Sequence, residues 1–256
     1  MSDIKIALIQ SHIYWEKIDQ NLEHFSRLAD SVHVDTDLIL LPEMFTTGFS
    51  MQTQWAQESG EKALEWLQKT AQEHRAMVIG TAMTACNGLY YNRLYAVFPD
   101  GSYKTYDKKH LFSMGKENRY YTAGDQKLIL EYKGWKIAPL TCYDLRFPAW
   151  CRLGGPFDLV TFHANWPQRR IHHWDLLLRA RAVENLCYVS AVNRVGLDGN
   201  EIAHNGSSQI IAPDGEVLCQ VHNETQVIHY HLSKSKLKET RKSYPFLKDQ
   251  DLLSIQ

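Results

Sequence analysis

The hydrophobic positions of this chain follow two periods, one typical of strands and the other of helices. Apolar runs at residues 4–9 (IKIALI) and 37–43 (DLILLPE) predict buried strands, and a proline closes the second run. Between them, apolar side chains recur every three or four residues from Trp15 to Ala29, which predicts an amphipathic helix. The chain therefore begins as strand, helix, strand.

The same alternation continues to the far end of the chain. Helical spacing returns at residues 63–71 and 171–185, and Lys133-Gly134 predicts a hairpin turn. Further strands are predicted at residues 76–83, 89–98, 102–112, 127–132, 135–142, 158–166, 187–195 and 208–221. No Gly-, Ser- or Pro-rich linker divides the chain and no repeat is visible, so we expect a single mixed α/β domain over residues 1–256, with helices outside its sheets.

Composition narrows the classes of partner. A net charge of -1 over 256 residues leaves no broad positive field for phosphate backbones, so we expect no nucleic-acid partner. The start, MSDIKIALIQ, lacks the basic region and long apolar stretch of a secretory signal. Apolar runs such as LILL are far shorter than the ~20 residues of a membrane span. We expect a cytoplasmic protein without a membrane anchor.

Cysteine and histidine usage argues against a disulfide framework and against a metal site. The five cysteines are an odd number without a C-x-x-C pair, which favours a reduced compartment. The chain has twelve histidines, but the segments HHW and HYH are not flanked by a carboxylate or cysteine at ligand spacing. We therefore expect no metal and no other cofactor.

Three polar residues stand at or near the ends of predicted strands, where α/β proteins gather catalytic groups. They are Glu43, Lys109 in YDKKHLF, and Cys142. At a strand-to-helix turn, Cys142 would lie near a helix N-terminus that lowers its pKa, and the Tyr143 amide would face an oxyanion. Each has a structural alternative: Cys142 as an inert core residue, Glu43 as a helix cap, and Lys109 as a solvated charge beside Lys108.

The chain resembles the nitrilase superfamily, the carbon–nitrogen hydrolases with a Glu–Lys–Cys triad. The matching segments are collinear and reach from about Ile4 to about Leu232. They are LILLPEMFTTGF, YDKKHLF, ENRYYTAGD, TCYDLRFP, HANWP, LLRARAVENLCYVSAVNRVG and GSSQIIAPDGEVL. The resemblance implies a four-layer α-β-β-α sandwich with a core over about residues 4–232 and a tail over about 233–256. It also implies a homodimer paired through outer helices.

The same resemblance implies a role for each site residue. Cys142 corresponds to the nucleophile, Glu43 to the general base and Lys109 to the residue that stabilises the tetrahedral intermediate. Glu117, seven residues before Gly124, corresponds to a second glutamate beside the triad, which could orient Lys109 or the hydrolytic water. No cofactor is implied.

The residues after the cysteine bear on the substrate. Nitrile-hydrolysing relatives typically have Trp-Glu there, whereas this chain has Tyr143-Asp144. CYDLRFP is similar to the branch that hydrolyses ω-amides of dicarboxylic acids, which implies 2-oxoglutaramate and 2-oxosuccinamate as substrates. Such an anionic amide needs a cationic pocket wall, for which Arg146, Arg169 and Arg170 are candidates. Arg146 could instead pair with Asp144, the role that we favour from sequence.

Three alternatives remain open from the sequence. A deaminated-glutathione amidase, or another small aliphatic amidase of the same superfamily, shares similar motifs. A cysteine–histidine hydrolase would use His110 or His163 as its base. A non-catalytic binding protein on the same fold would typically have lost a member of the triad, and all three are present here.

Overall fold

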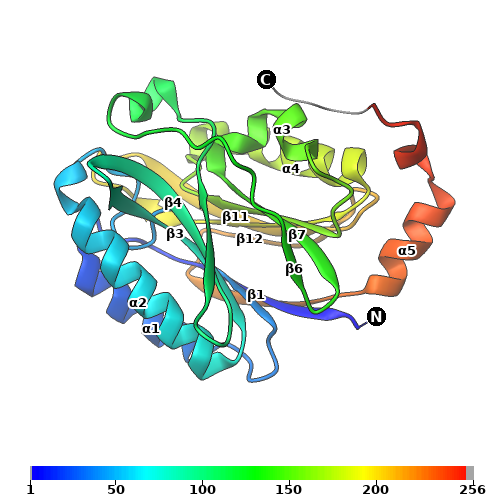
Figure 1. The fold of residues 1–256 in the computed structure, drawn as a ribbon, viewed down its shortest axis with the longest axis horizontal. Coiled ribbons are helices and arrows are strands. Elements are labelled where there is room, and N and C mark those ends of the chain that lie inside the picture. Colours follow the sequence, from blue (N-terminus) through cyan, green and yellow to red (C-terminus); the bar gives the residue numbers. More distant parts are fainter. Residues whose placement is uncertain (1, 252–256) are drawn as a thin grey trace.

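The computed structural model describes residues 2–251 and has four layers. Two sheets pack face to face, with α1 and α2 outside one sheet and α3 and α4 outside the other (Figure 1). The predicted α-β-β-α sandwich is confirmed. Within residues 2–251, no helix is long and apolar enough to cross a membrane.

The first sheet has the strand order β13-β1-β2-β3-β4-β5. The pairs β1–β2 and β2–β3 are parallel, and the other pairs are antiparallel. Its strands are β1 (Ile4–Gln10), β2 (Leu38–Leu40), β3 (Met77–Cys86), β4 (Leu89–Val97), β5 (Tyr103–Asp107) and β13 (Gln226–Leu232).

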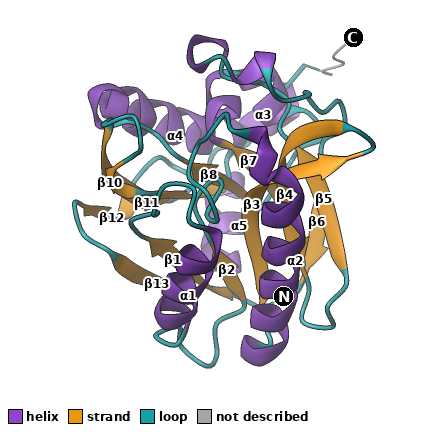
Figure 2. Cartoon of the chain, turned by 90° about the vertical axis from the view of Figure 1, so that its left-hand side faces the viewer, coloured by secondary structure: helices purple, strands orange, loops and turns teal. Residues whose placement is uncertain are grey.

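Alternating side chains of this sheet enter two different apolar clusters. Ile6 and Leu8 of β1 point into the cluster between the sheets, whereas Ala7 and Ile9 point to the outer cluster. Helices α1 (Ile18–Ala29) and α2 (Ala56–His74) cover that outer face (Figure 2). The buried face of α1 includes Phe25, as the helical spacing in the sequence predicts.

The second sheet has the order β10-β11-β9-β8-β7-β6, and β12 pairs with β11. Its centre, β7–β8–β9, is parallel. Its strands are β6 (Leu130–Tyr132), β7 (Trp135–Thr141), β8 (Leu159–Ala164), β9 (Tyr188–Asn193), β10 (Val195–Leu197), β11 (Ala203–Ile211) and β12 (Val217–His222). Helices α3 (Pro148–Arg152) and α4 (Ile171–Asn185) cover its outer face, and α4 buries Trp174 and Leu178.

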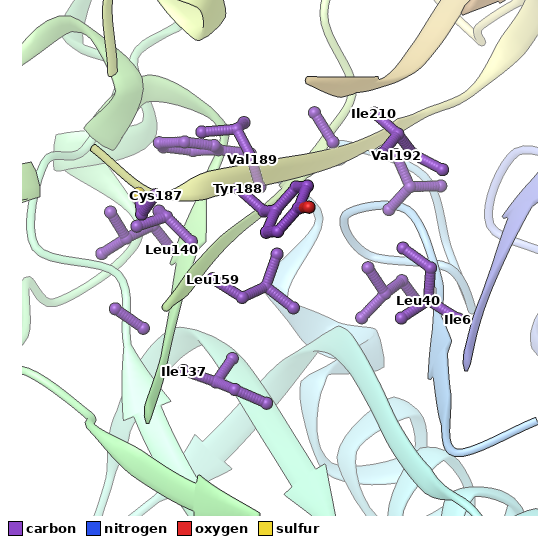
Figure 3. Close-up of a cluster of buried hydrophobic side chains, with 14 of the residues drawn as sticks. Ile6, Leu40, Ile137, Leu140, Leu159, Cys187, Tyr188, Val189, Val192 and Ile210 are labelled. Atoms are coloured by element: carbon purple, nitrogen blue, oxygen red, sulfur yellow. The ribbon is translucent and has the colours of Figure 1, made fainter. Parts of the chain in front are cut away.

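The core between the sheets joins side chains from both halves of the chain. Ile6 and Leu40 of the first sheet belong to the same buried cluster as Leu159, Val192 and Ile210 of the second (Figure 3). All five are fully buried, and burying such a side chain stabilises the fold by about 1.5–3 kcal/mol. The two sheets therefore hold the ends of their parallel strands in a fixed relation.

The tail is partly docked on this core. Helix α5 (Lys234–Ser243) buries Leu237, and the Lys234 ammonium lies 2.5 Å from Asp158 Oδ2. Arg241 Nη1 lies 3.1 Å from the other oxygen of Asp158. Six short 3₁₀ helices complete the described chain: Thr53–Trp55, Ser113–Gly115, Glu117–Arg119, Cys142–Arg146, Gln168–Arg170 and Phe246–Asp249.

Two differences from the predicted elements affect the account. The strand expected over residues 102–112 ends at Asp107, and the rest of that segment is loop and 3₁₀ helix. Strand β13 has no counterpart among the predicted strands. Its partner β1 lies more than 200 residues earlier, so its pairing has no local signal.

Candidate active site

Glu43 and Lys108 meet at one end of the sandwich. Glu43 stands three residues beyond β2, and Lys108 follows β5 directly. The Lys108 ammonium lies 2.8 Å from Glu43 Oε1, and both side chains are completely buried. The predicted convergence of a carboxylate and an ammonium from separate loops is therefore present, but with a different lysine.

The structure places Lys108, and not the predicted Lys109, beside Glu43 and in the lining of the pocket. Side chains alternate between the two sides of an extended chain, and Lys108 continues the buried side of Tyr106, which points between the sheets. Lys109 faces the other way, with its ammonium 5.6 Å from the centre of the Trp150 ring. Tyr106 and Lys108 are two residues apart and therefore share one side of an extended chain. This spacing is the signal in the sequence that could have distinguished the two lysines.

Glu117 completes the charged cluster, as the sequence resemblance implies. Its carboxylate oxygens lie 2.9 and 3.1 Å from the Lys108 ammonium, and Oε2 also accepts the Phe112 amide hydrogen at 2.6 Å. Asn92 Nδ2 donates to both glutamates, at 2.7 Å to Glu43 and 3.0 Å to Glu117. Sequence reasoning missed Asn92, which β4 places beside the cluster.

The two carboxylates determine the protonation of Lys108. Burial alone would lower the pKa of this lysine, but Glu117 and Glu43 outweigh burial and raise it, so Lys108 stays an ammonium ion. Burial raises the pKa of Glu117, the Lys108 charge opposes this, and the Glu43 charge adds to it. Two carboxylates thus share one ammonium, and all three groups are buried.

The second oxygen of Glu43 points toward the segment after β8. It accepts the Asn165 amide hydrogen at 2.9 Å, and the Asn165 side chain donates back to the Glu43 carbonyl. With Lys108 and Asn92 on Oε1, both oxygens of Glu43 are fixed by donors. A carboxylate held in this way has a fixed orientation, which suits proton exchange with a neighbouring group.

Cys142 lies at a sharp turn between β7 and the 3₁₀ helix Cys142–Arg146. Its φ of 40° lies in the left-handed region, which is unusual for a residue with a side chain. Asp144 Oδ2 accepts the Thr141 amide hydrogen at 3.1 Å and the Tyr106 hydroxyl at 2.6 Å, which anchors the turn to β5. Cys142 lines the same pocket as Glu43 and Lys108.

The expected lowering of the Cys142 pKa is wrong. Burial raises the pKa of this thiol well above its ordinary value, and the charge and hydrogen bond of Glu43 raise it further, whereas Lys108 opposes them. The helix that begins at Cys142 is a five-residue 3₁₀ helix, too short to offset burial. The sulfur is therefore a thiol at rest, and a role as nucleophile would require a base.

Tyr143 contributes its backbone and its ring. As the second residue of the 3₁₀ helix, its amide has no acceptor within that helix, which leaves it available for an oxyanion. The ring makes edge contacts with Phe112 at 5.1 Å and Phe147 at 5.2 Å and lines the pocket.

The two histidines of the alternative cysteine–histidine mechanism are engaged elsewhere. His163 Nδ1 lies 2.7 Å from the Leu41 carbonyl oxygen, and burial lowers its pKa to about 4. His110 Nδ1 lies 2.8 Å from Asp144 Oδ1. Glu43, in contrast, raises the pKa of Cys142 through its charge and a hydrogen bond. The geometry favours Glu43 as the base.

The pocket has a volume of about 450 Å³ and one strongly cationic side. Arg146, Arg169 and Arg170 all line it, and none has a carboxylate within 4.0 Å among residues 2–251. The pairing of Arg146 with Asp144 that we favour from sequence is therefore absent.

No group of three or more histidine, cysteine, aspartate or glutamate side chains within the described chain is arranged to hold a metal ion. The absence of a cofactor stays a prediction.

Comparison with known proteins gives one consistent family. A carbon-nitrogen hydrolase profile matches residues 5–242. The chain is 40% identical to the omega-amidase YafV of Escherichia coli K12 over 98% of both chains. It is 34% identical to the 2-oxoglutaramate amidase of Bacillus subtilis, over 95% of this chain and 96% of that protein.

Solved structures agree with the sequence comparisons. XC1258 from Xanthomonas campestris, a CN-hydrolase superfamily protein with an arsenic adduct in its active site, matches with a TM-score of 0.97 at 37% identity and covers 100% of both chains. Nit3 of Saccharomyces cerevisiae shares the fold, with a TM-score of 0.84 at 24% identity over 95% of this chain and 94% of that one.

Proposed function

Because the chain belongs to the carbon–nitrogen hydrolase family, we propose that it is an ω-amidase acting through a thioester on Cys142. Its substrates are monoamides of 2-oxo dicarboxylic acids, such as 2-oxoglutaramate and 2-oxosuccinamate. The observation that carries the chemistry is the buried contact of Lys108 with Glu43 beside the Cys142 thiol. The relatives that share this specificity by name support the substrate.

The first half-reaction forms the thioester. Glu43 takes the Cys142 proton while sulfur attacks the amide carbon, because the raised thiol pKa leaves little thiolate beforehand. The carbonyl oxygen becomes an oxyanion, stabilised by the Lys108 ammonium and the Tyr143 amide; one such donor is typically worth about 3 kcal/mol. Glu43 then gives its proton to the leaving nitrogen, the carbon–nitrogen bond breaks and ammonia departs.

The second half-reaction releases the acid. Glu43, again ionised, takes a proton from water, and the hydroxyl attacks the thioester carbon. The carbon–sulfur bond breaks, and the proton returns from Glu43 to sulfur. Glu117 does not exchange protons in this scheme. It holds Lys108 with both oxygens and so keeps the ammonium directed at the oxyanion.

The cationic side of the pocket selects the substrate. Arg146 lines the pocket together with Tyr143, and its guanidinium lies 4.8 Å from the centre of the Trp166 ring. A guanidinium without a carboxylate partner binds a carboxylate with charge-assisted hydrogen bonds. We propose that Arg146 binds the substrate carboxylate while the Cys142 thiol attacks the amide carbon.

The finer assignments of state and place are also proposals. We propose that two copies pair through α4, since Leu176 and Val183, seven residues apart on that helix, are 68% and 44% exposed. We also propose a cytoplasmic location, which suits a chain whose five cysteines are all free. Light scattering of the wild type and of Leu176→Glu tests the dimer, which the variant should dissociate.

Ammonia release tests the proposed activity with four of the substrates. Deaminated glutathione has a dipeptide as its leaving group, so the free amine of that dipeptide is measured instead. Purified enzyme is supplied with 2-oxoglutaramate, succinamate, deaminated glutathione, butyramide and butyronitrile in turn. We expect the highest kcat/KM for the two dicarboxylate monoamides and no turnover of the nitrile. Faster turnover of deaminated glutathione or of butyramide than of both monoamides would overturn the proposed specificity.

A further inference from the structure

Two arginines of the pocket are held on aromatic rings. The Arg146 guanidinium lies 4.8 Å from the centre of the Trp166 ring, and the Arg170 guanidinium lies 5.1 Å from that of Phe112. Stacking on a ring fixes the plane of a guanidinium and leaves its edge free to donate hydrogen bonds. Both groups line the pocket that contains Cys142.

These two charges line the same pocket, and neither has a carboxylate partner within the described chain. Burial lowers the pKa of Arg170, and the positive charges of Arg169 and Arg146 lower it further, while the Cys142 sulfur opposes them. Arg146 Nη2 lies 3.2 Å from His173 Nδ1, its one side-chain hydrogen bond within residues 2–251. Two like charges in a partly desolvated wall repel each other, and an anion between them would relieve that repulsion.

We propose that Arg170 is a second specificity-determining residue, which binds the substrate carboxylate together with Arg146. The proposal rests on the proposed ω-amidase function and assigns the far end of its substrate. Arg146 approaches from the turn of the nucleophile and Arg170 from the 3₁₀ helix after β8. A carboxylate has two oxygens, so each can meet one guanidinium edge.

The neighbouring Arg169 lacks the features that distinguish Arg170. Arg169 is exposed and stacks on no ring in the described chain, whereas Arg170 is half-buried against Phe112. Phe112 also carries the amide that donates to Glu117 Oε2 at 2.6 Å. An anion bound to Arg170 would therefore lie near Phe112, the residue whose amide holds Glu117 in place.

The test compares an anionic with a neutral amide. Kinetics are measured for the wild type, Arg170→Met and Arg169→Met with succinamate and with butyramide, which has a methyl group where succinamate has its carboxylate. We expect Arg170→Met to lower kcat/KM for succinamate about 10-fold to 100-fold, mainly through KM, and to change butyramide less than about 3-fold. Arg169→Met should lower kcat/KM for succinamate less than Arg170→Met does, because the Arg169 side chain is exposed.

Butyramide turnover also reports whether a variant is folded. If Arg170→Met proves inactive with both substrates, Arg170→Lys is measured instead. That variant keeps the charge but loses the planar fork, and it should show a smaller loss confined to succinamate. Equal losses with both substrates in Arg170→Lys, or an unchanged succinamate preference in either variant, would overturn the role of Arg170.

The failure of this inference is distinct from the failure of the proposed function. A wild type that prefers butyramide to succinamate contradicts the ω-amidase assignment before any variant is made. If the wild type prefers succinamate and Arg170→Met keeps that preference, the proposed ω-amidase function is retained. Only the role of Arg170 in binding the carboxylate is then rejected.

Discussion

The pocket brings together two groups of charges that are treated in opposite ways. At its base, Lys108 contacts Glu43 and Glu117 within 3.1 Å, and all three side chains are buried. On its wall, Arg146 and Arg170 have no carboxylate partner within the described chain and are partly open to solvent. The same fold thus completes one set of ion pairs and leaves the other incomplete.

The difference separates chemistry from selection. A buried, fully paired cluster is rigid, and its atoms are already in position when an oxyanion forms, so little reorganisation accompanies the reaction. Guanidinium groups without a carboxylate partner form charge-assisted hydrogen bonds only when an anion binds. They are therefore suited to substrate binding. Changes at the base should therefore affect every amide, and changes on the wall should affect anionic amides alone.

Removing the proton acceptor, Glu43, should have the largest effect. Glu43→Gln keeps the shape of the side chain but cannot accept the Cys142 proton, so we expect kcat to fall about 10³-fold to 10⁴-fold with succinamate and butyramide alike. His110→Gln, which tests the alternative base, should keep at least about a tenth of the activity. Steady-state ammonia release measures both, and the reverse order of losses would identify a cysteine–histidine hydrolase.

The neighbouring residues Lys108 and Lys109 should differ sharply when each is replaced. Lys108→Met removes an oxyanion donor, and kcat/KM should fall about 10²-fold to 10³-fold for both amides. Lys109→Met, one residue away, should change kcat/KM less than about 3-fold. Because breaking a buried ion pair costs about 3–5 kcal/mol, the folded fraction of each variant is measured by circular dichroism. A larger loss for Lys109 would restore the assignment made from sequence.

A change on the wall should be smaller and selective. Arg146→Met should lower kcat/KM for succinamate about 10-fold to 100-fold and leave butyramide within about 3-fold. Competition by succinate provides a second readout, since its inhibition constant should rise by a similar factor. Parallel losses with the neutral amide would mean that Arg146 supports the fold and not the carboxylate.

The protonation of Cys142 predicts a modest dependence of stability on pH. Above pH 8.5, the ordinary thiol pKa, the unfolded chain loses this proton while the folded chain, whose pKa is raised, keeps it. The folded state then binds more protons, so the free energy of unfolding falls as pH rises. Cys142→Ala should remove about 1.4 kcal/mol per pH unit from that slope.

Urea unfolding between pH 8 and 10 measures this slope. Cys151 and Cys187, whose pKa values burial raises to about 12, contribute a similar decline in both proteins. The difference between wild type and variant isolates Cys142. Identical slopes would mean that the thiol is already ionised near neutral pH.

Much of the architecture was predictable because its signals are local. The apolar spacing of residues 171–185 predicts α4 with the bounds that the structure gives it, and Lys133-Gly134 predicts the β6–β7 turn. Residues at strand ends pointed to Glu43 and Cys142 for the same reason. Strand β13 escaped prediction because its register is defined by β1, at the other end of the chain.

The errors at the site have physical causes that a motif alone does not show. Lys108 and Lys109 differ in the side of the strand that they face, and the strand was predicted to run on to Phe112 when it ends at Asp107. The Cys142 pKa reflects burial and the Glu43 charge together, and neither is visible in a motif. Asn92 joins both glutamates from a strand that carries no catalytic motif.

Detection of the covalent intermediate is the sharpest test of the proposed mechanism. Wild-type enzyme is quenched in acid within one turnover of succinamate, and its peptides are analysed by mass spectrometry, with Cys142→Ala as the control. The account predicts the mass of a succinyl group on the peptide with Cys142 and on no other, and none in the variant. An enzyme that releases ammonia from succinamate while Cys142 stays unmodified, or while Cys142→Ala remains active, would contradict it.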